Sequence, residues 1–430
     1  MLRLNSADSG FDKAFRRLVA DRRESDEDVA RDVALILNDV KNRGDAALAE
    51  LTQRFDGHAL TTDDDWRIGP ETCREAFDAL LPDLRAALEL AAQRIRIFHE
   101  AQLPADRDDT DAAGVRMGAK WRPVDAAGLY VPGGRAAYPS SLLMNAIPAR
   151  VAGVERLVVV TPTPKGQINP LVLAAAHLAG VDEIWRVGGA QAVAALAYGT
   201  QRIRPVDVIT GPGNAWVAEA KRQLFGVVGI DMVAGPSEIL VIADGKNDPE
   251  WIAADLLSQA EHDPAAQSIL ITDDPLFADT VADRVGVELT MLPTARVASE
   301  SWNTHGVIIE VPDIAEAAAL ANLLAAEHVE IATDDPEAIF RLIRHAGSVF
   351  LGRYTPEAVG DYVAGPNHVL PTGRRARFSS GLSVLDFMKR TSFIQLDAAA
   401  LAQIGPAAIA LADAEGLPAH ARSIETRLGI

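Results

Sequence analysis

The stretch SEILVIADGKNDPEWIAADLLSQAEHDPAAQSILITDD, residues 237–274, decides the fold of this chain. Its two ends, 237–244 and 268–274, are short runs of β-branched and aliphatic residues, the composition typical of strands. The segment between them, 248–263, is rich in alanine and leucine and has the pattern of a helix. A strand, a helix and a second strand in succession predict a βαβ unit, whose two strands lie parallel in one sheet.

The same alternation extends over most of the chain beyond residue 120. Four further runs are typical of strands: 156–164, 183–189, 205–214 and 306–313. Helical stretches separate them, and residues 1 to about 110 are mostly helical in pattern, as is an alanine-rich tail after residue 380. The fold class is therefore α/β, with parallel sheet between helical N-terminal and C-terminal segments.

Composition excludes several classes of protein. The 430 residues are 48% hydrophobic and carry 41 Lys and Arg against 60 Asp and Glu, a net charge of −19. This composition excludes disordered and fibrous chains, and so acidic a surface disfavours nucleic acid and anionic membranes as partners. No uncharged apolar run approaches the roughly 20 residues that span a bilayer, and the first residues lack the apolar core of a signal peptide. We therefore expect a cytoplasmic protein.

Cys73 is the only cysteine, which excludes an intrachain disulfide and a thiolate zinc site. It lies in a long stretch of helical periodicity, so we expect a residue of the core or of a helix surface rather than a nucleophile. If this protein oxidises an aldehyde, we expect the reaction to proceed without a thiohemiacetal.

Three glycine-containing loops share one design. They are YVPGG at 130–134, GGAQ at 188–191 and GPGN at 211–214, and each follows an apolar run or a strand. Glycine lets the backbone approach a ligand closely, and the N–H groups of a following helix favour phosphate. No G-x-G-x-x-G fingerprint occurs in them, so structural turns and a nucleotide site both stay open.

Two pairs of residues could carry chemistry. Gln259 and His262 are three residues apart in a helical stretch, a spacing that suits two metal ligands on one helix face and equally a polar helix end. Glu327 and His328 stand where an apolar helix gives way to the run VEIAT. An acid and an imidazole at such a junction can move protons near neutral pH, although a solvated helix end would have the same sequence.

Asp361 and His368 lie in the loop GDYVAGPNHVLPTG, where polar residues stand among apolar ones. His420 lies in EGLPAHARS near the C-terminus, five residues after Glu415. Spacing alone does not show which of these side chains meet in space.

Long motifs over nearly the whole chain give it a family resemblance. The chain resembles the L-histidinol dehydrogenase family in GIDMVAGPSEILVIAD (229–244), DLLSQAEHD (255–263), GLYVPGG, YPSSLLMNAIPA, GGAQAVAALAYGT, TGPGNAW, NHVLPTGRRARFSSGLSVLDF, KRTSFIQL and EGLPAHARS. The resemblance implies oxidation of L-histidinol through L-histidinaldehyde to L-histidine, the last two steps of histidine biosynthesis, with reduction of two NAD.

The resemblance also implies an organisation. It implies two incomplete Rossmann-like domains, one zinc ion per subunit and a homodimer with shared active sites. The expected limits are a helical segment over 1–25, a first domain from 26–129 with 239–381, a second domain over 130–238 and a C-terminal segment over 382–430 that reaches the partner subunit.

Site residues follow from the same resemblance, position by position. The zinc ligands would be Gln259, His262, Asp361 and His420. Substrate contacts would come from Ser237, Gln259, His262, His328, Asp361, His368, Glu415 and His420. NAD contacts would come from Tyr130, Gln191 and Asn214, one in each glycine loop, and Glu327 and His328 would be the catalytic pair.

Two other functions remain open at this point. One is a related enzyme that oxidises another small primary alcohol, such as a dihydroxypropane sulfonate, with zinc and NAD retained. The other is a protein that binds a nucleotide or a metal without catalysis. Binding of NAD and zinc without turnover of any alcohol would favour the second.

Overall fold

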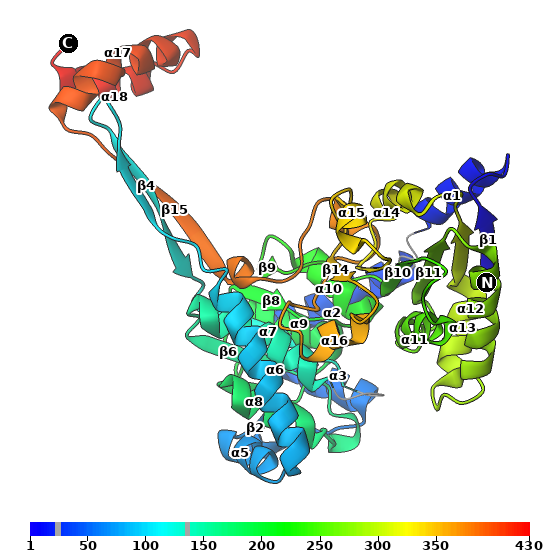
Figure 1. The fold of residues 1–430 in the computed structure, drawn as a ribbon. Helices are drawn as coiled ribbons and strands as arrows, with labels where there is room; N and C mark the ends of the chain where they lie inside the picture. Colours follow the sequence, from blue (N-terminus) through cyan, green and yellow to red (C-terminus); the bar gives the residue numbers. More distant parts are fainter. Residues whose placement is uncertain (22–26, 134–137) are drawn as a thin grey trace.

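Two six-stranded sheets and one three-stranded sheet organise the chain. The structure, a computed structural model, describes residues 1–21, 27–133 and 138–430. Figure 1 shows each six-stranded sheet with its own helices, and an arm that extends away from both and carries the C-terminus. The predicted α/β fold class with parallel sheets is confirmed.

The first sheet contains the predicted βαβ unit. Strand β10 (Glu238–Ala243) pairs in parallel with β11 (Gln267–Thr272), and α11 (Pro249–Ala260) connects them. All residues of both strands are buried, which explains their continuous apolar runs. The whole sheet has the order β1-β12-β11-β10-β13-β14, all parallel, with the remaining strands being β1 (Leu2–Asn5), β12 (Val307–Glu310), β13 (His328–Ala332) and β14 (Ser348–Leu351).

Helices cover both faces of the first sheet. One face packs against α1 (Phe11–Ala20), α14 (Ala317–Leu324) and α15 (Pro336–Phe340). The other packs against α11, α12 (Pro275–Glu288) and α13 (Ala295–His305). Short helical turns occur at η2 (Ile314–Glu316) and η3 (Arg375–Arg377), and α16 (Glu357–Tyr362) follows β14.

The second sheet has the order β2-β7-β6-β5-β8-β9. Its strands are β2 (Arg67–Ile68), β5 (Ala126–Tyr130), β6 (Arg156–Val160), β7 (Glu183–Trp185), β8 (Val208–Thr210) and β9 (Gly229–Ile230), and only β2 runs antiparallel to its neighbour in the described ladders. One face is covered by α5 (Pro70–Asp78), α6 (Pro82–Glu100), α7 (Pro139–Ala152) and α8 (Pro170–Ala179). The other is covered by α2 (Glu27–Arg43), α3 (Asp45–Asp56), α9 (Gly189–Tyr198) and α10 (Ala215–Leu224). Short turns occur at α4 (Asp63–Trp66), η1 (Pro164–Gly166) and η4 (Val384–Phe387).

The arm is an antiparallel ribbon with two helices at its end. Strand β4 (Arg116–Pro123) pairs with β15 (Met388–Gln395) on one side and with β3 (Arg107–Thr110) on the other. Helices α17 (Ala398–Ala414) and α18 (Pro418–Leu428) pack against each other beyond the ribbon, and Figure 1 shows them far from the two large sheets.

Sheet pairing differs from the expected segments in three places. Residues 1–25 were expected to be helical, but β1 adds a strand to the edge of the first sheet. Residues 26–129 were expected to belong with 239–381, but their strands β2 and β5 pair in the second sheet and their helices α2, α3, α5 and α6 pack on it. The C-terminal segment contains β15, whose mostly exposed side chains produce no apolar alternation for sequence patterns to detect.

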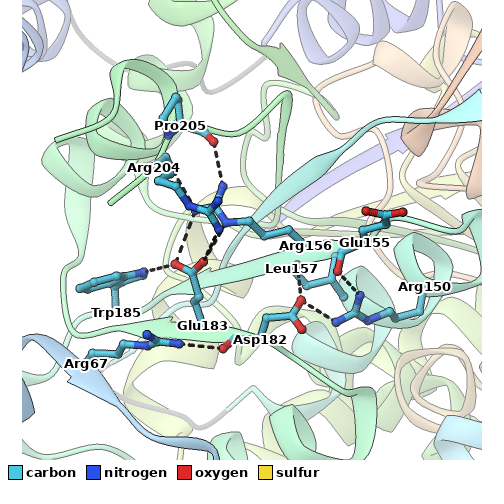
Figure 2. A network of polar contacts seen from close by, with 10 residues as sticks. All are labelled: Arg67, Arg150, Glu155, Arg156, Leu157, Asp182, Glu183, Trp185, Arg204 and Pro205. Carbon is cyan, nitrogen blue, oxygen red and sulfur yellow. Dashed lines mark hydrogen bonds and ion pairs between the residues drawn. The ribbon is translucent and has the colours of Figure 1, made fainter. Parts of the chain in front are cut away.

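An open hollow of about 760 Å³ lies at the amino ends of the second sheet's strands, at the edge opposite the glycine loops. Figure 2 shows a network of hydrogen bonds and ion pairs among residues that line this hollow and their neighbours. Arg156 contacts Glu183 at 2.7 Å and donates to the carbonyl oxygen of Pro205 at 2.9 Å, while Trp185 Nε1 donates to Glu183 at 2.9 Å. These bonds join β6, β7 and the segment before β8, so the network has a structural role.

No helix among the described residues has the length and apolarity that crossing a membrane requires.

Candidate functional site

Glu327 and His328 meet at the start of β13, beside β10 in the first sheet. The parallel register places His328 next to Ile239, so the peptide of the preceding Glu238 lies between the two side chains. Its N–H donates to Glu327 Oε2 at 3.0 Å, and its carbonyl oxygen lies 3.1 Å from His328 Nδ1. The backbone of one residue of β10, Glu238, therefore orients both members of the expected catalytic pair.

The hydrogen bonds of His328 fix its tautomer. Nδ1 lies 3.1 Å from the Glu238 carbonyl oxygen and 3.1 Å from Gln259 Oε1, and both oxygens accept. Nδ1 therefore carries the hydrogen, and Nε2 of the neutral ring carries the lone pair. Burial lowers the pKa of His328 to about 4, so the ring is neutral at pH 7 and Nε2 can accept a proton.

Two carboxyl groups from α16 face His328 Nε2. Glu357 Oε1 lies 3.6 Å from this atom and Asp361 Oδ1 lies 4.0 Å from it. Burial, together with the charge of Asp361, raises the pKa of Glu357 to about 8. Burial alone would also raise the pKa of Asp361, but the hydrogen bond and charge of His368, 3.7 Å away, hold it below its ordinary value.

Glu327 is buried on the other side of the imidazole. Its Oε2 lies 3.8 Å from His328 Nδ1. Burial raises the pKa of this carboxyl group well above its ordinary value, against the hydrogen bond from Glu238 that favours the charged form. A buried carboxyl beside a neutral imidazole is suited to proton transfer.

The expected metal ligands Gln259 and Asp361 lie on either side of His328. Gln259 is fully buried in the last turn of α11, and His262 follows in an exposed turn beyond Ala260, the last residue of that helix. The charge of His262 acts on both His328 and Asp361, which places it at this site.

Several buried polar atoms in this region have no hydrogen-bond partner among the described residues: Gln259 Nε2, His328 Nε2 and Glu357 Oε1. A carboxylate oxygen, an imidazole nitrogen and another carboxylate oxygen, from Asp361, His328 and Glu357, also lie within 4.8 Å of one another. Buried polar atoms that lack partners in the protein usually bind something else, and this donor set suits a divalent cation.

Glu357 did not emerge from sequence reasoning. It is 1% exposed, and its Oε2 accepts a hydrogen bond from Ser258 Oγ at 3.1 Å. The available signal was its position four residues before Asp361, which puts both acids on one face of a helix.

Other expected substrate contacts lie at different distances from this centre. His368 is half-buried beside Asp361, and its Nε2 lies 3.3 Å from Ser141 Oγ. Ser237 directly precedes Glu238 in the sequence and is half-buried. Glu415 and His420 are exposed on the arm, and Figure 1 shows that α17 and α18 are remote from β10 and β14, the strands on either side of β13.

The glycine loops meet at the carboxyl ends of the second sheet's strands. Tyr130 at the end of β5 is 4% exposed, and its hydroxyl accepts a hydrogen bond from Gly189 N at 3.1 Å, while burial raises its pKa to about 12. Gly211 has a φ of +112°, and a Cβ there would lie 2.2 Å from the Tyr130 carbonyl oxygen. Tyr130 therefore joins three loops; Gly134 of its own loop lies outside the described residues.

A buried ion pair holds the third loop. Lys221 contacts Asp231, and the two side chains are 2% and 1% exposed. Lys221 Nζ donates to the Gly211 carbonyl oxygen at 3.0 Å, and Asp231 Oδ2 accepts from Gly211 N at 2.8 Å. Charged side chains therefore bind both the carbonyl oxygen and the N–H group of Gly211.

The other expected NAD residues begin helices. Gln191 is 2% exposed in the first turn of α9. The exposed Asn214 caps α10, where its side chain accepts from Trp216 N at 3.1 Å and Val217 N at 3.2 Å. Helix starts beside strand ends are suited to a phosphate group.

Cys73 is a core residue, as expected. It is 4% exposed in α5 and packs in the core of the second sheet. Burial raises the pKa of its thiol to about 11, which keeps it protonated and unreactive.

Replacement of Asp255 by Asn should change how stability depends on pH. Burial raises the pKa of Asp255 from 3.8 to about 6, and Asp255 hydrogen-bonds with the buried Glu330. The folded state therefore binds more protons than the unfolded state between these values, and wild-type stability falls as pH rises through this range. We expect the free energy of unfolding of Asp255→Asn to exceed that of wild type by about 1–3 kcal/mol at pH 8. At pH 4 we expect the two values to be nearly equal.

Urea unfolding of both proteins at the two pH values measures this effect. Asp248→Asn is unsuitable as a control because Asp248 caps α11, whereas the exposed Asp263 beyond that helix offers a carboxyl outside the buried pair. Parallel pH profiles of wild type and Asp255→Asn would contradict the prediction.

Comparison with known proteins shows the family of this chain. The family model described as histidinol dehydrogenase matches residues 19–428. The chain is 63% identical to the histidinol dehydrogenase of Zymomonas mobilis, over 100% of this chain and 99% of that protein, and 61% identical to that of Rhodospirillum rubrum, over 99% and 98%. The crystal structure of histidinol dehydrogenase from Elizabethkingia anophelis superposes with a TM-score of 0.94 at 36% identity, and covers 100% of this chain and 98% of that one.

These matches span the whole chain, so they include both sheets, Glu327, His328 and the arm. They favour histidinol oxidation over the related enzyme for another small alcohol. The chain belongs to the histidinol dehydrogenase family, oxidoreductases that carry out the final steps of histidine biosynthesis.

Proposed function

We propose that this protein oxidises L-histidinol through L-histidinaldehyde to L-histidine in a zinc-dependent reaction that uses two NAD. The observation that carries this proposal is the neutral His328, whose Nε2 lone pair faces the carboxyl groups of α16. A proton acceptor beside potential metal ligands is what an alcohol oxidation requires.

The residues of this site fit a zinc ion. Gln259, His262 and Asp361 would hold it from one chain and His420 from a second, and the buried, unpartnered Glu357 Oε1 beside Asp361 supports a bound cation there. Zinc would supply a Lewis acid that anchors the imidazole and amine of the substrate and orients its CH₂OH group.

The three glycine loops would hold NAD, which accepts the hydride. Tyr130, Gln191 and Asn214 would form this site. The buried Lys221–Asp231 pair would keep the Gly211 loop in a conformation that admits the dinucleotide. Lys221 and Asp231 did not emerge from sequence reasoning, because a buried pair ten residues apart leaves no pattern.

The protein groups then have separate roles. His328 Nε2 accepts the hydroxyl proton of the alcohol in the first oxidation and that of the hydrated aldehyde in the second. Glu327 activates the water that hydrates the aldehyde. Cys73 lies in the core of the second sheet, so the route through a thiohemiacetal is not used.

A homodimer would complete the site. Glu415 and His420 are exposed on an arm that leaves the body of the chain, so they would enter the site of the partner subunit. Ser237, His368 and the partner's Glu415 would contact the substrate. We propose a cytoplasmic enzyme with no nucleic-acid or membrane partner, as the net charge of −19 favours.

The test is a count of NADH produced from limiting L-histidinol with excess NAD. Two equivalents, lost with a chelator and restored by zinc, are expected. One equivalent would mean that the aldehyde leaves and that Glu327 has no role as assigned. No NADH from a protein that holds zinc would favour the related enzyme for another small alcohol.

A further inference from the structure

We propose that Arg374 is a positioning residue that acts on both catalytic side chains through Glu238. The proposal rests on the roles given above to Glu327 and His328. Arg374 holds Glu238, the residue whose N–H and carbonyl groups bind both side chains.

Glu238 links the two ends of this arrangement. Its N–H and carbonyl groups bind Glu327 and His328, at 3.0 and 3.1 Å, while its side chain turns the other way to Arg374. Arg374 Nη1 donates to Glu238 Oε1 at 2.9 Å, and the two side chains are 2% and 1% exposed. A shift of Glu238 would therefore move both catalytic groups together.

Three segments of the first sheet fix the guanidinium group. Besides β10, Arg374 Nη2 donates to Gln267 Oε1 on β11 at 3.0 Å and to the Leu18 carbonyl oxygen of α1 at 3.4 Å. The planar guanidinium group of arginine can donate hydrogen bonds to several acceptors in different directions at once, whereas lysine has a single ammonium group.

The backbone around Arg374 supports a specific placement. Arg374 has a φ of +68°, in the left-handed region that a non-glycine residue adopts at some cost. Two residues earlier, Thr372 Oγ1 accepts a hydrogen bond from Gly235 N. The loop that contains Thr372 and Arg374 therefore binds the chain at two points where it enters β10, Gly235 and Glu238.

A buried ion pair contributes little net stability relative to an apolar pair of the same size, although removal of one partner alone destabilises the fold. It does restrict geometry, and small displacements of catalytic groups cost about 100-fold in rate. The expected effect of removing Arg374 is therefore on turnover more than on binding, since the expected zinc ligands and the glycine loops lie on other segments.

The experiment compares Arg374→Met and Arg374→Lys with a matched control, Arg156→Met. Arg156 also forms a sheltered ion pair with a glutamate, with side chains 14% and 12% exposed, but at the far edge of the second sheet (Figure 2). We expect kcat of both oxidations to fall about 10- to 100-fold in Arg374→Met, with the KM values for L-histidinol and NAD and the zinc content near wild type. Arg156→Met should keep wild-type kcat.

Arg374→Lys keeps a positive charge beside Glu238, so it should fold even if the methionine variant does not. We expect it to recover stability and a part of kcat, about 10-fold below wild type, because it loses the fork to Gln267 and Leu18. Equal kcat in all three variants, or a raised KM with unchanged kcat, would overturn the proposal. Wild type that oxidises no L-histidinol in the same assay would instead reject the proposed function.

Discussion

Glu327→Gln should convert the enzyme into one that stops at the aldehyde. The amide cannot take a proton from water, so we expect the aldehyde oxidation to slow about 10²- to 10⁴-fold and the alcohol oxidation to slow much less. The substitution keeps the shape of the side chain and an oxygen that can accept the hydrogen bond from Glu238 N. In the wild-type structure this nitrogen lies 3.0 Å from Glu327 Oε2. A trapping reagent for aldehydes, with NADH counted in parallel, should show about one NADH per L-histidinol instead of two.

Glu357→Gln is the matched control for this prediction. It also replaces a buried carboxyl beside His328, but on the Nε2 side, 3.6 Å away. A residue there faces the atom that serves in both oxidations, so we expect both rates to fall alike. Equal losses in the two steps for Glu327→Gln would reject its role in activating water.

The position of Glu327 and His328 between a helix and a strand was predictable, because two hydrophobic periodicities meet there. The sequence indicates an apolar helix before Glu327 and a strand after it, and α14 ends at Leu324 and β13 begins at His328, as expected. What the pattern does not contain is the neighbouring strand. Only the structure shows that β10 lies parallel beside β13, which brings the N–H and carbonyl groups of Glu238 to both side chains.

Gln259 and His262 show a limit of spacing arguments. Three residues apart, they were expected on one helix face, but α11 ends at Ala260 and His262 lies in the turn that follows. Glu261 keeps helical dihedral angles and His262 N donates to the Gln259 carbonyl oxygen at 3.2 Å, so a helical turn still joins the two residues, and the charge of His262 acts at the site. A helix end is set by capping and tertiary packing, which local composition reflects poorly.

The assignment of 26–129 failed for a different reason. A helical pattern indicates that a segment is amphipathic, but it does not indicate which sheet its apolar face packs against. Here β2 directly precedes the helical run 70–100, and β5 follows it after strands β3 and β4 of the arm, so both ends of this run connect to strands of the second sheet. The sequence did not predict the arm either. An exposed ribbon buries neither face, so its strands show no alternation of apolar and polar residues.

Two inactive variants should restore activity when they share a dimer. His328→Asn removes the proton acceptor, and we expect a loss of about 10³-fold or more. His420→Asn removes a proposed zinc ligand, so zinc content and activity should fall together. In a mixed dimer, the site built on the chain with intact His328 would receive the arm with intact His420. Random assembly makes half of the dimers mixed, with one sound site in two, so about a quarter of wild-type L-histidine formation should return.

His328→Asn mixed with Glu327→Gln is the control for this experiment. Both residues lie on β13 or directly before it, in the body of the chain, so every site of their mixed dimer keeps one defect, and L-histidine formation should not recover. Recovery in the first mixture alone requires that His420 act across the interface, as its exposed position on the arm favours. If neither mixture recovers while mixed dimers are shown to form, the arm serves its own chain, and the ribbon of β4 and β15 must bend back to bring His420 to Asp361.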